Sequence, residues 1–141
     1  MRTKTDPALV ASELRAVLGQ LVRRLRAEHR FPLSHGAVLG RLDREGAQSV
    51  SDLAHAERVR PQSMAQTVAD LESDGLVERR PDLDDRRRAL VELTGKGHEA
   101  LAADRRHREG WLADAIAGEL TPAEQAVLGE AAPILRRLAQ S

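Results

Sequence analysis

The chain contains no cysteine and no tyrosine, and its only aromatic residues are Phe31 and Trp111. Without cysteine, disulfides, thiolate nucleophiles, thiolate-held iron–sulfur clusters and thiol-based redox sensing are excluded. A core with so few aromatic side chains must be built from Leu, Val and Ala, which favours packed helices over a β-sandwich. The composition therefore favours a mainly helical protein. It also fits a reducing compartment, and we expect a cytoplasmic location.

The chain also lacks net charge and long apolar runs. Its 22 basic residues balance 22 acidic ones, and no apolar run approaches the roughly 18 residues that a membrane span needs. We therefore expect no membrane contact, and no signal peptide is recognised at the start. Because the net charge is zero, any affinity for nucleic acid must come from where the arginines point.

Apolar periodicity and capping residues predict about six helices in this one-domain chain of 141 residues. Residues 1–5 are expected to form a loose tail. Helix starts are marked by side chains that can cap a helix or by a proline that suits its first turn. The predicted helices begin near Asp6-Pro7, Ser34, Ser49, Pro61, Thr94 and Thr121, and they end near residues 29, 46, 57, 74, 118 and 139.

A candidate β-hairpin lies between the fourth and fifth predicted helices. Residues 76–80 and 89–93 can form two short strands, and a Pro-Asp turn signal follows the first. The connecting loop carries Arg86, Arg87 and Arg88, which could reach a negatively charged partner. A solvated run of charges would look the same, so the hairpin alone leaves both interpretations open.

The helix predicted after Pro61 has an uncharged polar start, and no charged residue precedes Asp70. Ordinary surface helices are usually rich in Lys and Glu. A helix in the DNA major groove instead needs side chains such as Gln, which can pair with adenine, and small residues that let the backbone approach. The candidate DNA contacts on this helix are Arg60, Pro61, Gln62, Ser63, Gln66 and Thr67.

Several short segments of the chain follow one another in a specific order. They are Leu53-Ala54, Arg60-Pro61-Gln62-Ser63-Met64, Thr67-Val68, Leu71-Glu72, Gly75-Leu76-Val77-Glu78-Arg79, a wing-like part from Asp82 to Arg87, and Val91-Glu92-Leu93-Thr94. In this order and spacing they resemble the MarR family of bacterial winged-helix regulators, and the resemblance covers nearly the whole chain. One departure is Leu83, where the family often has a proline nearby.

The resemblance implies one MarR-like domain over residues 1–141, with a winged helix-turn-helix at about 31–96. Residues 6–30 and 97–140 would form a helical dimerisation region in which the first, fifth and sixth helices interlock. The family implies a homodimer on a palindromic operator of double-stranded DNA. It usually implies repression that a small molecule relieves, and we expect an aromatic or phenolic acid.

The residues of the wing are expected to have different roles. Asp85 and Arg87 are two positions apart, so in an extended chain they lie on one side. Asp85 can then support Arg87, and the family resemblance places that arginine in the minor groove. Arg86 and Arg88 would point toward phosphates or solvent.

Enzyme and metal chemistry find little support. The chain has no phosphate-binding glycine loop, no nucleophile elbow and no zinc-protease helix. Its five histidines are scattered, and with no cysteine we expect neither a metal site nor a cofactor. A different class of function stays open: a winged-helix dimer that acts as a protein–protein interaction module, which a net charge of zero allows.

Overall fold

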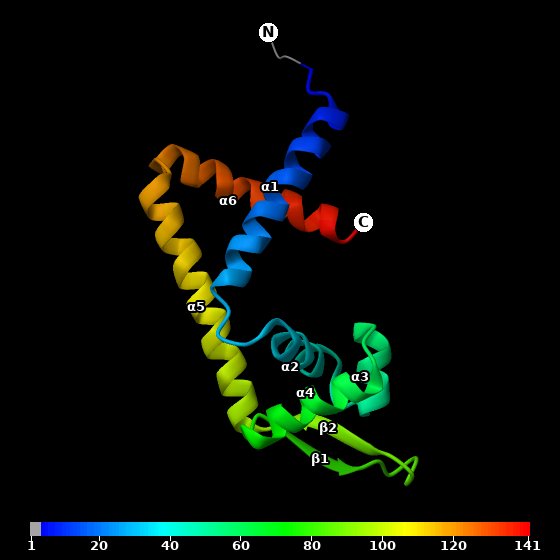
Figure 1. Cartoon of the computed structure of the whole chain (residues 1–141). Coiled ribbons are helices and arrows are strands. Elements are labelled where there is room, and N and C mark those ends of the chain that lie inside the picture. Colours follow the sequence, from blue (N-terminus) through cyan, green and yellow to red (C-terminus); the bar gives the residue numbers. More distant parts are fainter. Residues whose placement is uncertain (1–3) are drawn as a thin grey trace.

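The computed structural model describes residues 4–141, and within them it contains six helices and one antiparallel hairpin (Figure 1). The expected tail therefore lies partly outside the described residues. The elements are α1 (Pro7–Ala27), α2 (Leu33–Glu45), α3 (Val50–Glu57), α4 (Pro61–Ser73), β1 (Val77–Pro81), β2 (Ala89–Leu93), α5 (Gly95–Glu119) and α6 (Pro122–Ala139). The predicted fold class, a mainly helical winged helix-turn-helix, is confirmed.

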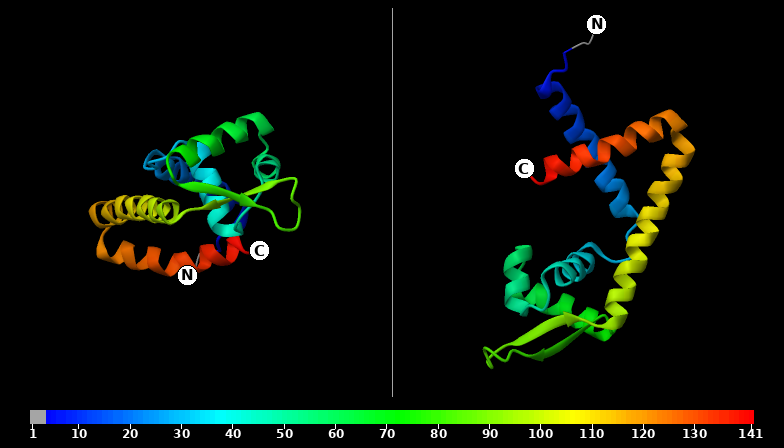
Figure 2. Two further views of the ribbon diagram at one scale, coloured as in Figure 1. Left: turned by 90° about the horizontal axis from the view of Figure 1, so that it is seen from below. Right: turned by 180° about the vertical axis from the view of Figure 1, so that it is seen from behind.

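The molecule has two parts, which the views of Figures 1 and 2 show from three sides. Helices α2, α3 and α4 and the hairpin form a compact unit, which we call the reader. Helix α5 leaves the reader beside the hairpin, and α1 and α6 lie together at its far end. The hairpin, which we call the wing, projects from the reader on the side away from α1 and α6.

Most helix starts follow the local capping signals. The side chain of Asp6 accepts a hydrogen bond from the Ala8 N–H at 2.9 Å, and Thr121 and Glu124 form a reciprocal capping box. The prediction that Ser34 caps α2 is wrong. Helix α2 already begins at Leu33 after Pro32, without a side-chain cap. Pro32 itself is extended, with a φ of −52° and a ψ of 148°, and its carbonyl accepts the Gly36 N–H at 3.0 Å, which closes the first turn of α2.

The buried core of the chain lies in the reader and at the start of α5. Leu39, Leu53 and Leu71 are fully buried and come from α2, α3 and α4 in turn. Burying one such side chain contributes about 1.5–3 kcal/mol. The rest of the core comprises Val38, Leu42, Ala54, Met64, Val68, Leu76, Val77, Val91 and Leu101. The helix-turn-helix and the base of the wing therefore share one core.

Helix α4 passes into the wing through a tight C-terminal turn. Gly75 takes a φ of +76°, which glycine adopts without strain. The Leu76 N–H donates to the Leu71 carbonyl and the Gly75 N–H to Glu72, the bond pattern of a Schellman motif. Strand β1 starts at Val77, one residue later than predicted, because Leu76 completes this turn.

The strands pair in one register, with Val77 opposite Leu93 and Pro81 opposite Ala89. Gln48, in the loop before α3, exchanges two backbone hydrogen bonds with Val91 of β2, at 2.7 and 3.0 Å. The base of the wing is thus attached to the helix-turn-helix at both strands: β1 follows α4 in the chain, and β2 is hydrogen-bonded to the backbone just before α3.

A buried carboxylate joins α5 to the connection between α1 and α2. Asp104 is 1% exposed and accepts hydrogen bonds of 2.8 Å from the Arg30 N–H and from Nδ1 of His29. The Arg108 Nε lies 3.2 Å from the same carboxylate, which is ion-pair distance without hydrogen-bond alignment. Burial alone would raise the pKa of Asp104, but these donors together hold it below the ordinary value.

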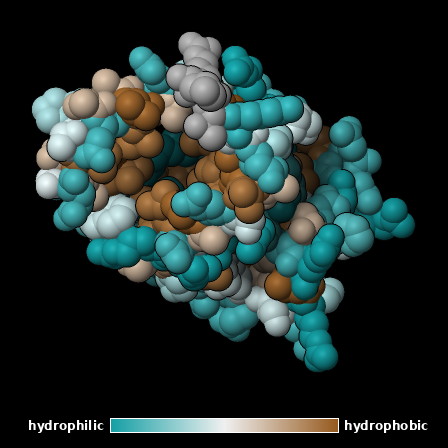
Figure 3. Space-filling model, turned by 90° about the horizontal axis from the view of Figure 1, so that it is seen from above, coloured by the Kyte–Doolittle hydropathy of each residue, from teal (hydrophilic) through white to brown (hydrophobic). Residues whose placement is uncertain are grey.

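No residue of helix α1 or helix α6 is buried. A shallow groove between them is lined mainly by apolar residues, among them Leu14, Leu18, Leu135 and Leu138. Figure 3, which looks down on this end, shows apolar surface gathered in patches. Further large apolar side chains stand exposed on the two helices: Leu9, Val10, Val17, Leu21, Val22, Val127, Leu128 and Ile134. Among residues 4–141, no helix has both the length and the apolarity that crossing a bilayer requires.

Candidate nucleic-acid interface

Helix α4 buries one face and leaves the other open. Met64, Val68 and Leu71, at helical spacing, pack into the core. The opposite face carries Gln62 and Gln66, both exposed. The sequence therefore presents its uncharged polar side chains on the surface, as the interpretation of this helix as a recognition helix requires.

The candidate DNA-contacting residues of α4 differ in their exposure and in the hydrogen bonds that their side chains already make. Gln66 donates to the Asp70 carboxylate at 2.9 Å, a bond that it would have to exchange for a base. Within residues 4–141, Gln62 makes no side-chain hydrogen bond by the same criteria. Thr67 is half-buried and donates to the Ser63 carbonyl at 3.1 Å, so it is the least accessible of the set.

The start of α4 follows a tight turn after α3. Arg58 ends α3 in the left-handed conformation with a φ of 56°, and the Val59 N–H returns to the Ala54 carbonyl at 3.0 Å. A left-handed residue other than glycine costs about 1–2 kcal/mol. Arg60 then flanks the helix, Pro61 is its first residue, and both are exposed. The turn thus fixes the direction in which α4 leaves α3.

The wing carries five arginines, which line one shallow groove with Pro81 and Ala89. Arg79 on β1 lies 3.4 Å from Glu72, and its neighbour Arg80 lies 3.0 Å from Glu92. Arg86, in the loop, has no carboxylate within ion-pair distance among residues 4–141. The wing therefore combines paired arginines along its strands with an arginine near its tip that has no such partner in this part of the chain.

Asp85 and Arg87 meet as the sequence predicts, but they do so across a turn and not in the extended chain on which the prediction was based. Asp85 Oδ1 accepts from both the backbone N–H and Nε of Arg87, each at 3.1 Å. These bonds hold the pKa of Asp85 below its ordinary value. The Arg87 side chain is nevertheless 91% exposed. Asp85 can thus hold Arg87 in place without withdrawing it from an approaching polyanion.

Arg88 lies differently from the other two loop arginines. Its Nε is 2.7 Å from Oδ2 of Asp82, and its Nη1 is 3.3 Å from Oδ2 of Asp52 on α3. The sequence signal for Asp82 was only that of a turn residue, and nothing near Asp52 indicated a partner in the wing. The structure therefore brings together a three-residue cluster that sequence reasoning missed.

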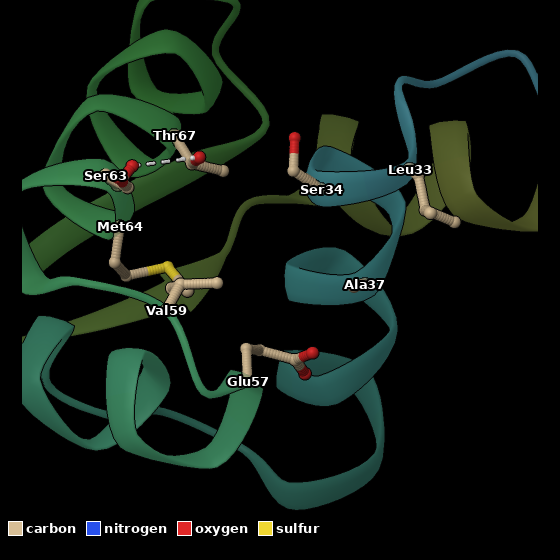
Figure 4. Close-up of a pocket in the computed structure, with 8 residues that line it drawn as sticks. All are labelled: Leu33, Ser34, Ala37, Glu57, Val59, Ser63, Met64 and Thr67. Carbon is tan, nitrogen blue, oxygen red and sulfur yellow. Dashed lines mark hydrogen bonds between the residues drawn. The ribbon is translucent and has the colours of Figure 1, made fainter.

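A pocket of about 280 Å³ lies behind α4, inside the reader (Figure 4). Leu33, Ser34 and Ala37 of α2 face Val59 and the back of α4 across it. Glu57 also lines it, and its carboxylate accepts from Arg41 at 2.7 Å. Ser63, Met64 and Thr67 complete the lining. No lining residue comes from residues 6–30 or 97–140, so the pocket lies outside the expected dimerisation region.

The histidines of the chain lie apart from one another. Residues 4–141 contain no group of three or more His, Asp or Glu side chains placed to hold a metal ion. His29, His35, His98 and His107 each lie near a single carboxylate, and His35 is 3.7 Å from Asp70. Each of these histidines therefore has one carboxylate neighbour and not a set of possible ligands.

A short helix, a tight turn, a second helix with an open polar face and an adjacent arginine-bearing hairpin define a winged helix-turn-helix DNA-binding protein. Comparison with known proteins identifies the family. A sequence model of the MarR family matches residues 31–89. An uncharacterized HTH-type transcriptional regulator of Mycobacterium bovis is 37% identical over 134 residues, which are 93% of each chain.

Solved structures agree with this assignment. A Pseudomonas aeruginosa protein described as a transcriptional regulator superposes with a TM-score of 0.79 and 36% identity, over 98% of this chain and 99% of that one. A mutant of S. aureus MepR bound to an oligodeoxyribonucleotide shares the fold, with a TM-score of 0.68 and 18% identity, over 93% and 96% of the two chains. The chain belongs to the MarR family. It is a helix-turn-helix transcriptional regulator and not an enzyme.

Proposed function

We propose that the protein is a homodimeric repressor that binds a pseudo-palindromic DNA operator and releases it when a small molecule binds. The observation that carries the proposal is the pairing of two surfaces in one chain. One end presents apolar helices with nothing to cover them among the described residues, and the other presents a polar recognition helix beside a wing that bears five arginines.

Dimerisation is supported by the exposed apolar side chains of α1 and α6. A small soluble monomer rarely leaves so many large apolar groups in water, and contiguous patches of this kind mark interaction sites. The helices concerned, α1 and α6, lie at the two ends of the sequence but at one end of the molecule. A second copy of the chain is the simplest partner, because an identical patch can cover itself across a two-fold axis.

DNA recognition would then use two parts of the reader, helix α4 and the wing. The open face of α4 would enter the major groove, where Gln62 and Gln66 can pair with adenine edges. Arg60, Pro61, Ser63 and Thr67 would lie at the edges of this contact. Two readers related by a two-fold axis would bind two half-sites about 34 Å apart, one turn of the duplex. The operator would accordingly be pseudo-palindromic.

The wing would add contacts next to the major groove. Arg87 would enter the minor groove, where narrow A·T-rich sequence concentrates negative potential. Arg86, which has no carboxylate partner among residues 4–141, would bind a phosphate. Because most wing arginines are already paired and the net charge is zero, binding to random DNA would be weak.

The family resemblance supports a small-molecule effector, and an aromatic or phenolic acid is the class we expect. Occupation of a site that contacts both the helices at the dimer end and the reader would change the spacing of the two recognition helices. Because its proposed target is DNA, we expect the protein to act in the cytoplasm.

The test begins with selection of duplexes from a random-sequence library by the wild-type protein. Gln62→Ala and Gln66→Ala should each cost about 1–3 kcal/mol on the selected duplex and little on a scrambled one, because base-edge bonds carry the sequence information. Gln140→Ala, at the far end of the chain, is the matched control. Fluorescence anisotropy at fixed salt gives the affinities, and light scattering gives the oligomeric state.

Failure of the proposal is easy to recognise. If no duplex is enriched, or if the protein is a stable monomer at micromolar concentration, the proposed function is wrong. A dimer that enriches no sequence would instead favour the alternative, a winged-helix dimer that acts as a protein–protein interaction module.

A further inference from the structure

The cluster of Asp82, Arg88 and Asp52 joins two elements that are distant in the sequence. Arg88 is the last loop residue before β2, and Asp82 is the first after β1. Asp52 lies 36 positions before Arg88, in the first turn of α3. One guanidinium therefore contacts the wing loop with its Nε and the helix-turn-helix with its Nη1.

We propose that Arg88 does not contact DNA but is a positioning residue, which fixes the direction of the wing relative to the recognition helix. This inference rests on the proposed function, because it concerns how the wing is presented to the operator. It assigns Arg88 a role different from that of its neighbours Arg86 and Arg87. We call the cluster of Asp82, Arg88 and Asp52 the tether.

Electrostatics argue against a phosphate contact by Arg88. The tether contains two carboxylates and one guanidinium, so its net charge is −1. Asp82, the nearer carboxylate, is only 5% exposed, and it also accepts the Asp84 N–H at 3.0 Å. The Arg88 guanidinium holds the pKa of Asp82 below its ordinary value, and Asp82 in turn raises the pKa of Arg88. A phosphate approaching this cluster would meet a net negative charge.

Geometry shows what the tether does for the wing. Below the loop, the wing is held by the β1–β2 ladder and by the bridge between Gln48 and Val91. Those bonds fix its base, while the tether fixes the loop that bears Arg86 and Arg87. Asp52 belongs to α3, which packs directly on α4. The tether therefore holds the wing arginines at a set distance from the recognition helix.

A charge-neutralising substitution distinguishes the two roles of Arg88, because they predict opposite changes in DNA affinity. Asp52→Asn removes a negative charge and releases one side of Arg88. If Arg88 is a tether, the selected duplex should be bound about three- to tenfold more weakly by the dimer, since each exposed ion pair contributes up to about a factor of five. If Arg88 is a phosphate contact, the same substitution should tighten binding. Asp84→Asn is the control, because it removes a wing charge outside the tether and should not weaken binding.

The salt dependence of binding supplies an independent measurement. Arg88→Gln should weaken binding as Asp52→Asn does but leave the slope of log K against log salt unchanged. Arg86→Ala should lower that slope by about 0.9 for each phosphate that it no longer neutralises. The double variant Asp52→Asn, Arg88→Gln should be no weaker than Arg88→Gln alone, because Arg88→Gln already removes the contact with Asp52. A general loss of stability would instead weaken selected and scrambled duplexes alike.

The outcomes separate the two proposals. Wild-type protein that binds no selected duplex overturns the proposed function, and the tether proposal with it. Wild-type protein that binds specifically, with Asp52→Asn tightening the complex or Arg88→Gln lowering the salt slope, overturns only the tether proposal. Weaker specific binding with an unchanged slope in both variants supports it.

Discussion

Gly97→Ala is expected to destabilise the protein, although alanine is the better helix former. Gly97 lies in the first turn of α5, where the helix passes against the turn that precedes β1. A methyl group at this position would overlap the Leu76 carbonyl oxygen and lie 3.0 Å from its carbon and 3.3 Å from Cδ2 of Leu93. The contact is therefore with backbone as well as with a side chain.

Two opposing effects decide the magnitude. Alanine gains up to about 1 kcal/mol over glycine in a helix. Inserting a methyl into a packed site costs about 1–3 kcal/mol, sometimes more. The cost should lie at or above the upper end here, because the Leu76 carbonyl is held by the Thr94 N–H at 3.1 Å and cannot swing aside. We expect a net loss of about 2–3 kcal/mol, from the difference of these two effects.

Urea unfolding followed by circular dichroism measures this loss. Protein concentration must be held fixed, because dissociation of a dimer makes the apparent stability concentration-dependent. Gly95→Ala is the matched control: it lies in the same helical turn, and a Cβ there would meet nothing within 4 Å. If Gly97→Ala is as stable as Gly95→Ala, the close approach of α5 to the wing does not exist in solution.

Four further substitutions have expected outcomes. Asp85→Ala should weaken DNA binding even though it removes a negative charge, and Arg87→Ala should lower the salt slope by about 0.9 for each phosphate left without its counter-charge; tighter binding by Asp85→Ala in anisotropy titrations would contradict this. Asp104→Asn should cost about 1–3 kcal/mol in urea at pH 7. Because the folded pKa of Asp104 is lowered, its stabilisation is present above its ordinary pKa and disappears as pH falls through the folded value, so the variant should show a flatter acid profile. Thr121→Ala should lower stability by about 1 kcal/mol in thermal melts by removing the α6 cap.

Local signals predicted most of the secondary structure. Asp6 and Thr121 mark helix starts because the capping bonds join residues only two or three positions apart. The same logic failed at Ser34, where the start of α2 follows from the backbone of Pro32 rather than from a side-chain cap. A capping residue shows that a helix can begin at a position, but the competing start at Pro32, two residues before Ser34, is not visible in the sequence.

The parts of the candidate site that follow from helical spacing could be predicted from the sequence. The parts that depend on contacts between residues distant in the sequence could not. The helical spacing of Gln62 and Gln66 placed both on the open face of α4. By contrast, Arg86, Arg87 and Arg88 look equivalent in the sequence. Only the fold brings Asp52 to Arg88. The Asp104 network was invisible for the same reason, because its hydrogen bond to the Arg30 N–H spans 74 positions.

The unbroken length of α5 has a mechanical consequence. This helix of 25 residues begins beside the wing and ends at α6, so it is a rod about 37 Å long. A tilt of about 5° at one end of such a rod moves the other end by about 3 Å. Substitutions near Glu119 lie far from any base pair, but by changing the tilt of α5 they should change the distance between the two readers of a dimer. They should therefore alter which half-site separation the protein prefers.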